Sequence, residues 1–361
     1  MLSEKEIRRY SRHIRMVEIG EKGQEKLKQA KVLVVGAGGL GCPILQYLTA
    51  AGVGTIGILD YDTVDESNLQ RQILFTPEDI DKPKALVAKE KLSKQNPFVN
   101  FNIHFLKLTK KNALDIFNDY DIIVEGSDNF PTRYLTNDAC VILKKPLVYG
   151  AIEKFYGQIT VFNYLNGPTL RCLAPEPPDP LEIPSCSDVG VMGVMPGIIG
   201  TMQACEVIKI ITGVGNVLNG RLLLVDALNF NFDTIELEKN PDSDTITELK
   251  DYTDFCTNET TVKKISAKEL RNLLDCKEKI VIIDLRDEDD TENFSIATDN
   301  IPLGEISKNI HKIPIDIKVV FACRYGIKSL SAINYLQKKS DFTNLYSLEN
   351  GIAEWNATLE K

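Results

Sequence analysis

The hydrophobic pattern near the start of the chain predicts a strand, a turn, a helix and a second strand. Val32 to Val35 is an unbroken apolar run of strand length, as expected of a parallel strand buried on both faces. Residues 42–51 have the pattern of a helix, and Thr55 to Leu59 is a second β-type run that ends at Asp60. The turn after the first run contains four glycines, Gly36, Gly38, Gly39 and Gly41. The segment is therefore predicted to form a βαβ unit.

A glycine-rich turn at this place is typical of a nucleotide-binding site. Glycines let the backbone approach a phosphate, and the free N–H groups at the start of the next helix can bind it. An acid about 20 residues further on, here Asp60, can hydrogen-bond ribose hydroxyls. The pattern fits dinucleotide-binding Rossmann domains as well as ATP-binding relatives, so it does not select the nucleotide.

Further β-type runs continue this α/β pattern. Strands are expected at 100–106, 120–125, 145–148 and 158–163, and helices at 3–20, 83–95 and 130–143. The strand at 120–125 is followed by Gly126, Ser127, Asp128 and Asn129. Because ligands of open α/β sheets bind at the carboxyl ends of the strands, Asp128 is a candidate to hold Mg²⁺ on a nucleotide phosphate. The alternative is that Asp128 and Ser127 cap the next helix.

The connection after Asp60 is polar and contains Asn68, Arg71, Gln72 and Lys84. Cations near a nucleotide's phosphates suit triphosphate chemistry, in which charge develops on the α-phosphate and on departing pyrophosphate. A dehydrogenase needs only the acid after its second strand, so these residues weaken the dinucleotide interpretation. A solvated loop remains the alternative.

Composition and charge narrow the class of protein. The chain has 361 residues, enough for about two domains, and its 43% hydrophobic content is ordinary for a globular protein. A formal charge of −9 argues against a broad surface for nucleic acid or acidic membranes. The charged N-terminus lacks the apolar core of a signal peptide, and residues 189–213 are interrupted by Pro196, Glu206 and Lys209. We expect a cytoplasmic protein.

The eight cysteines are scattered without paired spacing, which favours reduced thiols over a disulfide framework. Cys42 and Cys205 lie in apolar helical runs, and we expect both in the core.

Taken together, these motifs resemble the MoeB/ThiF family of ubiquitin-activating-enzyme-like adenylyltransferases. GAGGLGC, LDYDTVDESNLQRQ, GSDN, GQITVF and CSDVGVMGVMPGIIGTMQACEVIK follow one another from about residue 5 to residue 240. The resemblance implies a Rossmann-like domain that uses ATP and Mg²⁺ to adenylate the C-terminal glycine of a small ubiquitin-like sulfur-carrier protein, of the MoaD/ThiS kind. It also implies a homodimer, since Arg12 falls where the family sends an arginine into the neighbouring subunit's site.

The resemblance assigns roles to individual residues. Gly39 would lie against the nucleotide, Asp60 on its ribose, and Asp128, beside Asn129, on Mg²⁺. The ribose and phosphates would be contacted by Ser67, Asn68, Leu69, Gln70, Arg71 and Lys84. Arg12, Arg71, Lys84 and Mg²⁺ would neutralise the developing charge. No side-chain nucleophile is needed, because AMP makes the carrier's carboxylate reactive by serving as its leaving group.

Two cysteine positions bear on how far the resemblance extends. Many relatives hold a structural zinc with two Cys-x-x-Cys pairs, but here Thr169 replaces the partner of Cys172, and residues 240–246 contain no cysteine. Four soft ligands cannot be assembled, so we predict no structural zinc. Cys186 matches a loop cysteine that some relatives use in a covalent link to the carrier or in sulfur relay. A loop thiol without chemistry is the alternative.

A polar linker is expected at 241–261, between a first domain at 1–240 and a second at 262–361. In the second domain, helices are expected at 265–274 and 329–338, and strands at 280–285 and 318–322. Cys323 then heads a loop whose N–H groups point toward it, with Arg324 and Lys328 nearby. Such an anion-binding loop lowers a thiol's pKa and can hold a persulfide.

This second segment resembles a single, small α/β rhodanese domain, through CRYGIKS, IIDLRDEDD and NGIAEWNATL. A tyrosine-phosphatase loop is the alternative, but it would place arginine six residues after Cys323, where Ser329 stands. The family's usual Gly-His-Ile segment is replaced by SIATDNIPL, a departure that bears on the contacts of this loop.

Together the two segments predict adenylation of a carrier followed by attack of a Cys323 persulfide, which forms a thiocarboxylate. The sulfur donor would be a cysteine desulfurase or thiosulfate. The carrier could serve molybdopterin, thiamine or tRNA thiolation, and the sequence does not choose among them. A non-catalytic carrier-binding scaffold and a nicotinamide-dependent oxidoreductase are the alternatives.

Overall fold

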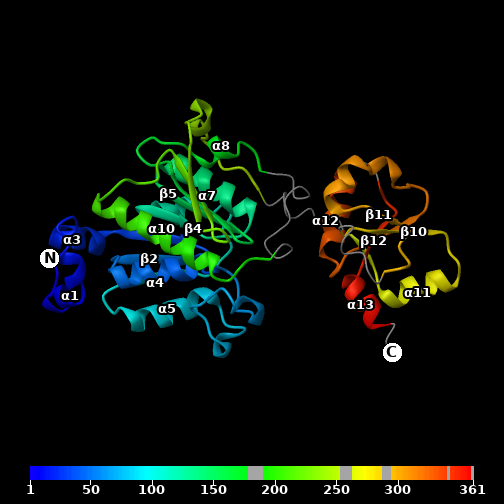
Figure 1. The fold of residues 1–361 in the computed structure, drawn as a ribbon, viewed down its shortest axis with the longest axis horizontal. Coiled ribbons are helices and arrows are strands. Elements are labelled where there is room, and N and C mark those ends of the chain that lie inside the picture. Colours follow the sequence, from blue (N-terminus) through cyan, green and yellow to red (C-terminus); the bar gives the residue numbers. More distant parts are fainter. Residues whose placement is uncertain (178–189, 253–261, 287–293, 340–341, 359–361) are drawn as a thin grey trace. The chain divides into compact units, whose positions relative to one another are not determined.

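A computed structural model describes residues 1–177, 190–252, 262–286, 294–339 and 342–358, and these form two compact units (Figure 1). Residues 241–252, part of the range expected as linker, are grouped with the first unit. None of the helices in the described ranges is both long and apolar enough to cross a membrane.

An eight-stranded sheet forms the centre of the first unit, in the order β3-β2-β1-β4-β5-β6-β7-β8. The parallel part contains β3 (Asn100–His104), β2 (Thr55–Leu59), β1 (Lys31–Val35), β4 (Ile122–Glu125) and β5 (Leu147–Glu153). The antiparallel part adds β6 (Tyr156–Phe162), β7 (Arg221–Asp226) and β8 (Asn231–Glu236). The predicted α/β class is confirmed, although β7 and β8 were not predicted.

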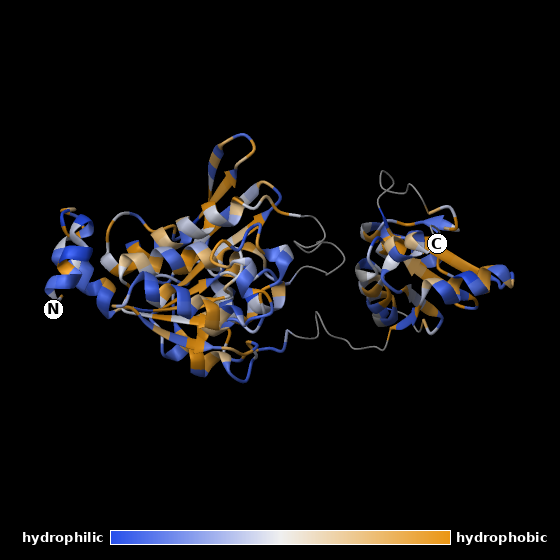
Figure 2. Cartoon of the chain, turned by 90° about the horizontal axis from the view of Figure 1, so that it is seen from below, coloured by the Kyte–Doolittle hydropathy of each residue, from blue (hydrophilic) through white to orange (hydrophobic). Residues whose placement is uncertain are grey.

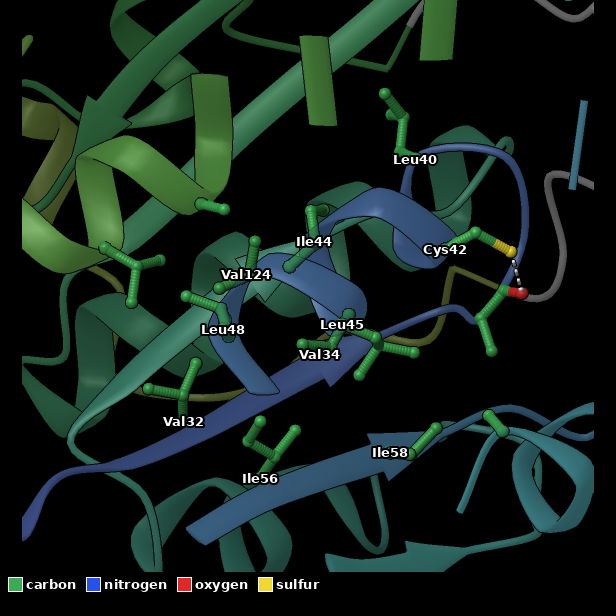
Figure 3. Packing of buried hydrophobic residues seen from close by; sticks show 14 of the residues in the cluster. Val32, Val34, Leu40, Cys42, Ile44, Leu45, Leu48, Ile56, Ile58 and Val124 are labelled. Carbon is green, nitrogen blue, oxygen red and sulfur yellow. Dashed lines mark hydrogen bonds between the residues drawn. The ribbon is translucent and has the colours of Figure 1, made fainter. Parts of the chain in front are cut away.

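Helices cover both faces of this sheet. The first face packs against α3 (Gly20–Gln29), α4 (Gly41–Ala51), α5 (Lys84–Gln95) and α10 (Met195–Thr212). The second packs against α6 (Ala113–Asn118) and α7 (Phe130–Leu143). The run of β1 is apolar throughout because both its faces are buried. Val32 and Val34 enter the first core (Figure 3), and Leu33 and Val35 enter the second.

The expected helix at 3–20 is in fact two short helices, α1 (Glu4–Arg9) and α2 (Ser11–Ile14), divided at the buried Tyr10. Ser3 and Glu6 cap α1 reciprocally. Cys42 is buried as expected, but the expectation for Cys205 is wrong, because its side chain is exposed on α10. An apolar helix has no polar face to show which side meets solvent, so the sequence could not place Cys205.

The second unit has a five-stranded parallel sheet, in the order β11-β10-β12-β13-β9. Its strands are β9 (Lys263–Ile265), β10 (Ile280–Asp284), β11 (Asp299–Asn300), β12 (Lys318–Ala322) and β13 (Leu345–Leu348), and its α-helices are α11 (Ala267–Asp275), α12 (Ile327–Lys339) and α13 (Gly351–Ala357). Strongly hydrophobic strands are visible in both units in Figure 2. Each unit therefore has its own core, as an independent domain requires.

Candidate functional site

The glycine turn after β1 is closely packed at two positions. Gly36 has a φ of +92°, and a Cβ atom there would lie 2.9 Å from the carbonyl oxygen of Gly126. A Cβ atom on Gly41 would lie 2.1 Å from the carbonyl oxygen of Gly36. The turn between β1 and α4 therefore lies against the loop that follows β4, and only glycine fits there.

Asp60 joins the end of β2 to this turn. Its Oδ2 accepts a hydrogen bond from the N–H of Ala37 at 2.7 Å, and its Oδ1 accepts one from the N–H of Asp62 at 2.8 Å. The side chain is buried, and burial raises the pKa of its carboxyl. An ionised carboxylate offers about four acceptor positions, so these two bonds leave room for ribose hydroxyls.

Two cations lie beside the turn. Lys84, the first residue of α5, is buried, and its Nζ is 3.3 Å from Oδ2 of Asp62. Lys84 also opposes the effect of burial on the pKa of Asp60, which places its charge near that carboxylate. The Cδ atom of Arg71 lies 3.8 Å from where a Cβ on Gly39 would be.

The segment 66–70 begins with the 3₁₀ helix η1 (Glu66–Asn68), which the carboxylate of Asp65 caps through the N–H of Ser67. Ser67 and Gln70 are exposed and Asn68 is half-buried. Leu69 packs on the first core. The carbonyl of Ser67 accepts a hydrogen bond from Nη1 of Arg71 at 3.1 Å, so this segment helps to fix the arginine.

Asp128 is exposed at the carboxyl end of β4, and Asn129 is the residue that caps α7, by accepting a hydrogen bond from the N–H of Thr132 at 3.0 Å. The described residues contain no group of three or more potential metal ligands. One exposed carboxylate nevertheless fits Mg²⁺ bound with a nucleotide, because this ion is commonly held by one or two carboxylates together with phosphate oxygens.

Arg12 lies exposed on α2, and the described residues give it no hydrogen bond or ion pair. Cys186 lies at 178–189, outside the described residues. The predicted groups on β1, β2 and β4 meet at one edge of the sheet, whereas Arg12 stands apart from their contacts.

Cys323, the cysteine expected to carry sulfur, directly follows β12. Cys323 is buried with 2% of its surface exposed, and its Sγ lies 3.7 Å from Oγ of Ser329 on α12. The carbonyl of Cys323 accepts a hydrogen bond from the N–H of Ile352 at 2.9 Å. Gly351 has a φ of +68°, and a Cβ there would lie 2.3 Å from that same carbonyl. The cysteine loop is therefore held by the start of α13.

Asn300 lies in SIATDNIPL, the segment that replaces the usual Gly-His-Ile of rhodanese domains. Asp284 and Arg286 form a buried ion pair with Nη2 and Oδ2 2.8 Å apart. Nδ2 of Asn300 donates to the carbonyls of Asp284 and Arg286 at 3.0 and 2.9 Å. The amide of Asn300 thus connects the replaced segment to residues 284–286, a contact that the sequence analysis did not predict.

The residues around Cys172 do not fit a structural zinc. Its Sγ accepts hydrogen bonds from the N–H groups of Thr169 and Asn240, each at 3.3 Å, and lies 3.1 Å from Oγ of Ser243. Burial alone would raise the pKa of this thiol, but these hydrogen bonds outweigh it and lower the pKa. Of the four positions that would form such a site, only Cys172 has a thiol. Hydrogen bonds to its sulfur connect residues 169–172 with residues 240–243.

A buried acid was also missed. Glu125 ends the apolar strand β4, and its side chain is fully buried beside Arg133 of α7. The signal available in the sequence was a carboxylate placed at the end of a run that is otherwise apolar.

Comparison with known proteins gives two family matches. Residues 10–246 match the ThiF family, and residues 266–358 match the rhodanese-like domain. The chain is 42% identical over 369 residues to the probable adenylyltransferase/sulfurtransferase MoeZ of Mycobacterium tuberculosis, covering 98% of this chain and 94% of that protein.

Two further similarities concern the first unit. A sulfur carrier protein adenylyltransferase of Thermus thermophilus is 49% identical over 265 residues, which cover 70% of this chain and 98% of that protein. The crystal structure of E. coli MccB with ATP superposes with a TM-score of 0.57 at 22% identity, covering 66% of this chain and 74% of that one. That likeness shows a shared fold.

Proposed function

Because the chain belongs to the ThiF family of adenylyltransferases and carries a rhodanese-like sulfurtransferase domain, we propose that it activates a small ubiquitin-like sulfur carrier and converts its terminal carboxylate to a thiocarboxylate. The names of its relatives, adenylyltransferase/sulfurtransferase and sulfur carrier protein adenylyltransferase, support this proposal. The observation that carries it lies at the carboxyl ends of β1, β2 and β4, where the glycine turn meets residues 126–129, called here the Asp128 loop. Asp60, Arg71 and Lys84 lie beside the same turn.

In the adenylation step, a carboxylate oxygen of the carrier's last glycine attacks the α-phosphorus of ATP, and pyrophosphate leaves. Arg71 and Lys84 neutralise charge on the phosphates, while Asp60 orients the ribose. Asp128 would hold Mg²⁺, which supplies further positive charge when bound with the nucleotide. Arg12 of a second copy would complete the site, so the active form is a homodimer.

In the sulfur-transfer step, the terminal sulfur of a Cys323 persulfide attacks the acyl carbon, and AMP leaves. The product is an acyl group joined to Cys323 through a disulfide. A thiolate then attacks Sγ of Cys323, which releases the thiocarboxylate and leaves a new disulfide at Cys323. Cys186 is a candidate for that thiolate. The persulfide would come from thiosulfate or a cysteine desulfurase, and we propose a cytoplasmic location.

The test is mass spectrometry of candidate carriers after incubation with the protein, ATP, Mg²⁺ and thiosulfate. One carrier should gain a C-terminal thiocarboxylate. Cys323→Ala should keep carrier-dependent ATP–pyrophosphate exchange and lose thiocarboxylate formation. Loss of exchange in that variant would contradict the division of labour between the two domains. Carrier binding without ATP turnover would indicate a scaffold, and nicotinamide binding without carrier-dependent AMP release would indicate an oxidoreductase.

A further inference from the structure

Glu125 is a fully buried carboxylate that the proposed chemistry does not use. It is the last residue of β4, and its exposed fraction is 0%. Transfer of a carboxylate out of water is costly unless partners compensate. Its Oε2 accepts no hydrogen bond from any described residue and faces Nε of Arg133 at 3.6 Å. We therefore expect a carboxylate buried in an otherwise apolar strand to have a specific role.

The contacts of Glu125 are concentrated on Ser127. The Oε1 atom of Glu125 accepts hydrogen bonds from the backbone N–H of Ser127, at 2.7 Å, and from its hydroxyl. Nη2 of Arg133 donates to the carbonyl of Ser127 at 3.3 Å. The N–H, hydroxyl and carbonyl of Ser127 are thus all engaged by two buried side chains. Asp128, the next residue, is exposed.

This pair is itself held from several directions. The guanidinium of Arg133 lies 5.4 Å from the ring centre of Phe130 and 5.7 Å from that of Tyr149. Nε2 of Gln203, on α10, donates to the carbonyl of Glu125 at 2.7 Å. The loop also lies against the glycine turn, since a Cβ on Gly126 would lie 3.4 Å from the N of Gly41. The Asp128 loop therefore has a rigid support on both sides.

We propose that Glu125 and Arg133 are positioning residues that fix Ser127, and through it the orientation in which Asp128 meets the magnesium–nucleotide complex. The inference rests on the proposed adenylation site. Neither residue is assigned a contact with substrate. Their role is indirect, and outer partners of this kind commonly change metal affinity by about 10- to 100-fold.

The test is calorimetric titration of the full-length protein with a non-hydrolysable ATP analogue, with and without Mg²⁺. Glu125→Gln should weaken binding about 10- to 100-fold with Mg²⁺ and leave binding without it near wild type. An amide cannot present two acceptor oxygens to Ser127 and Arg133. Ser127→Ala should give a smaller loss with the same dependence on Mg²⁺, and it provides a second variant if Glu125→Gln does not fold.

Asp138→Asn is the matched control, because Asp138 is another buried carboxylate, on α7 itself, and it is paired with Arg171 rather than with Arg133. It should leave the Mg²⁺ dependence unchanged. In an Asp128→Ala background, Glu125→Gln should have no further effect on the Mg²⁺-dependent part of binding. Equal weakening with and without Mg²⁺, or additive effects in the double variant, would overturn the positioning role. Absence of nucleotide binding by the wild-type protein would instead count against the proposed function.

Discussion

The hydroxyl of Tyr252 donates a hydrogen bond to the buried carboxylate of Asp138, a residue 114 positions earlier in the chain. Arg171 binds the same carboxylate, with Nε to Oδ1 and Nη2 to Oδ2 both at 3.1 Å. The ring of Tyr252 packs near that of Tyr134, and only 4% of Tyr252 is exposed. The chain thus remains attached to the first unit up to Tyr252, immediately before residues 253–261.

This anchor predicts a specific effect of Tyr252→Phe. The variant keeps the ring but loses the hydrogen bond donated to Asp138 and the one accepted from Arg171. It should therefore lower the stability of the first unit by at least about 1.5–3 kcal/mol. The free energy of unfolding of the first unit, obtained from its transition in urea, measures this loss. Tyr47→Phe is the control, since Tyr47 is exposed. Equal stability of both variants would contradict the anchoring of the chain at Tyr252.

A second prediction concerns the two partners of the Lys84–Asp62 ion pair. Lys84→Met removes a buried cation next to the glycine turn, and should lower carrier-dependent ATP–pyrophosphate exchange by about 10²- to 10³-fold. Asp62→Asn should cost far less, because Asp62 is 51% exposed and exposed ion pairs contribute about 1 kcal/mol or less. Similar losses in both variants would show that Asp62, rather than the charge of Lys84 alone, controls the reaction.

The sequence indicated the centre of the first sheet because β1, β2 and β4 are buried on both faces. The apolar runs of β1 and β2 are continuous and of strand length, and each is followed by a glycine or an acid. Such runs indicate buried strands. The residues of β8 are exposed throughout, so its sequence carries no burial signal. Of the other two antiparallel strands, β6 was predicted at 158–163, and β7 was missed although it is partly buried.

In the candidate site, the motifs located Asp60 and Lys84 beside the turn, but not their supports. Whether a carboxylate such as Glu125 is buried depends on a partner from another element, here Arg133, and no local pattern records that pairing. Asn300 was missed because its hydrogen bonds reach back 16 and 14 residues, to Asp284 and Arg286. Such contacts follow from tertiary packing rather than from periodicity.

A third prediction follows from Asp79, which is buried in the connection before α5. Burial would raise the pKa of its carboxyl, but hydrogen bonds from Lys91 and from the N–H and hydroxyl of Thr76 outweigh this effect and lower the pKa. A lowered pKa means that the ionised form stabilises the fold above the unfolded value of about 3.9, and that this contribution is lost as pH falls through the folded pKa.

Asp79→Asn should therefore destabilise the protein by about 1.5–3 kcal/mol at pH 7, and the difference from wild type should shrink as the pH falls below about 4. Denaturant unfolding over this pH range measures the difference. Glu78→Gln, at an exposed neighbour, should have little effect throughout. A difference that stays constant with pH would show that the charge of Asp79 is not what stabilises the connection.

The last prediction concerns the turns that meet at Cys172. Thr169 and Asn240 donate their N–H groups to its sulfur, and Ser243 lies 3.1 Å from it, so two pairs with i, i+3 spacing face one centre. Combining Thr169→Cys, Asn240→Cys and Ser243→Cys should create a tetrathiolate site that binds one zinc per chain. Cobalt absorption under reducing conditions measures it, and the signal should be lost when Cys172→Ser is added. A chelator should leave the wild-type melting temperature unchanged. Failure of the triple variant to bind metal would show that the turns do not share a centre.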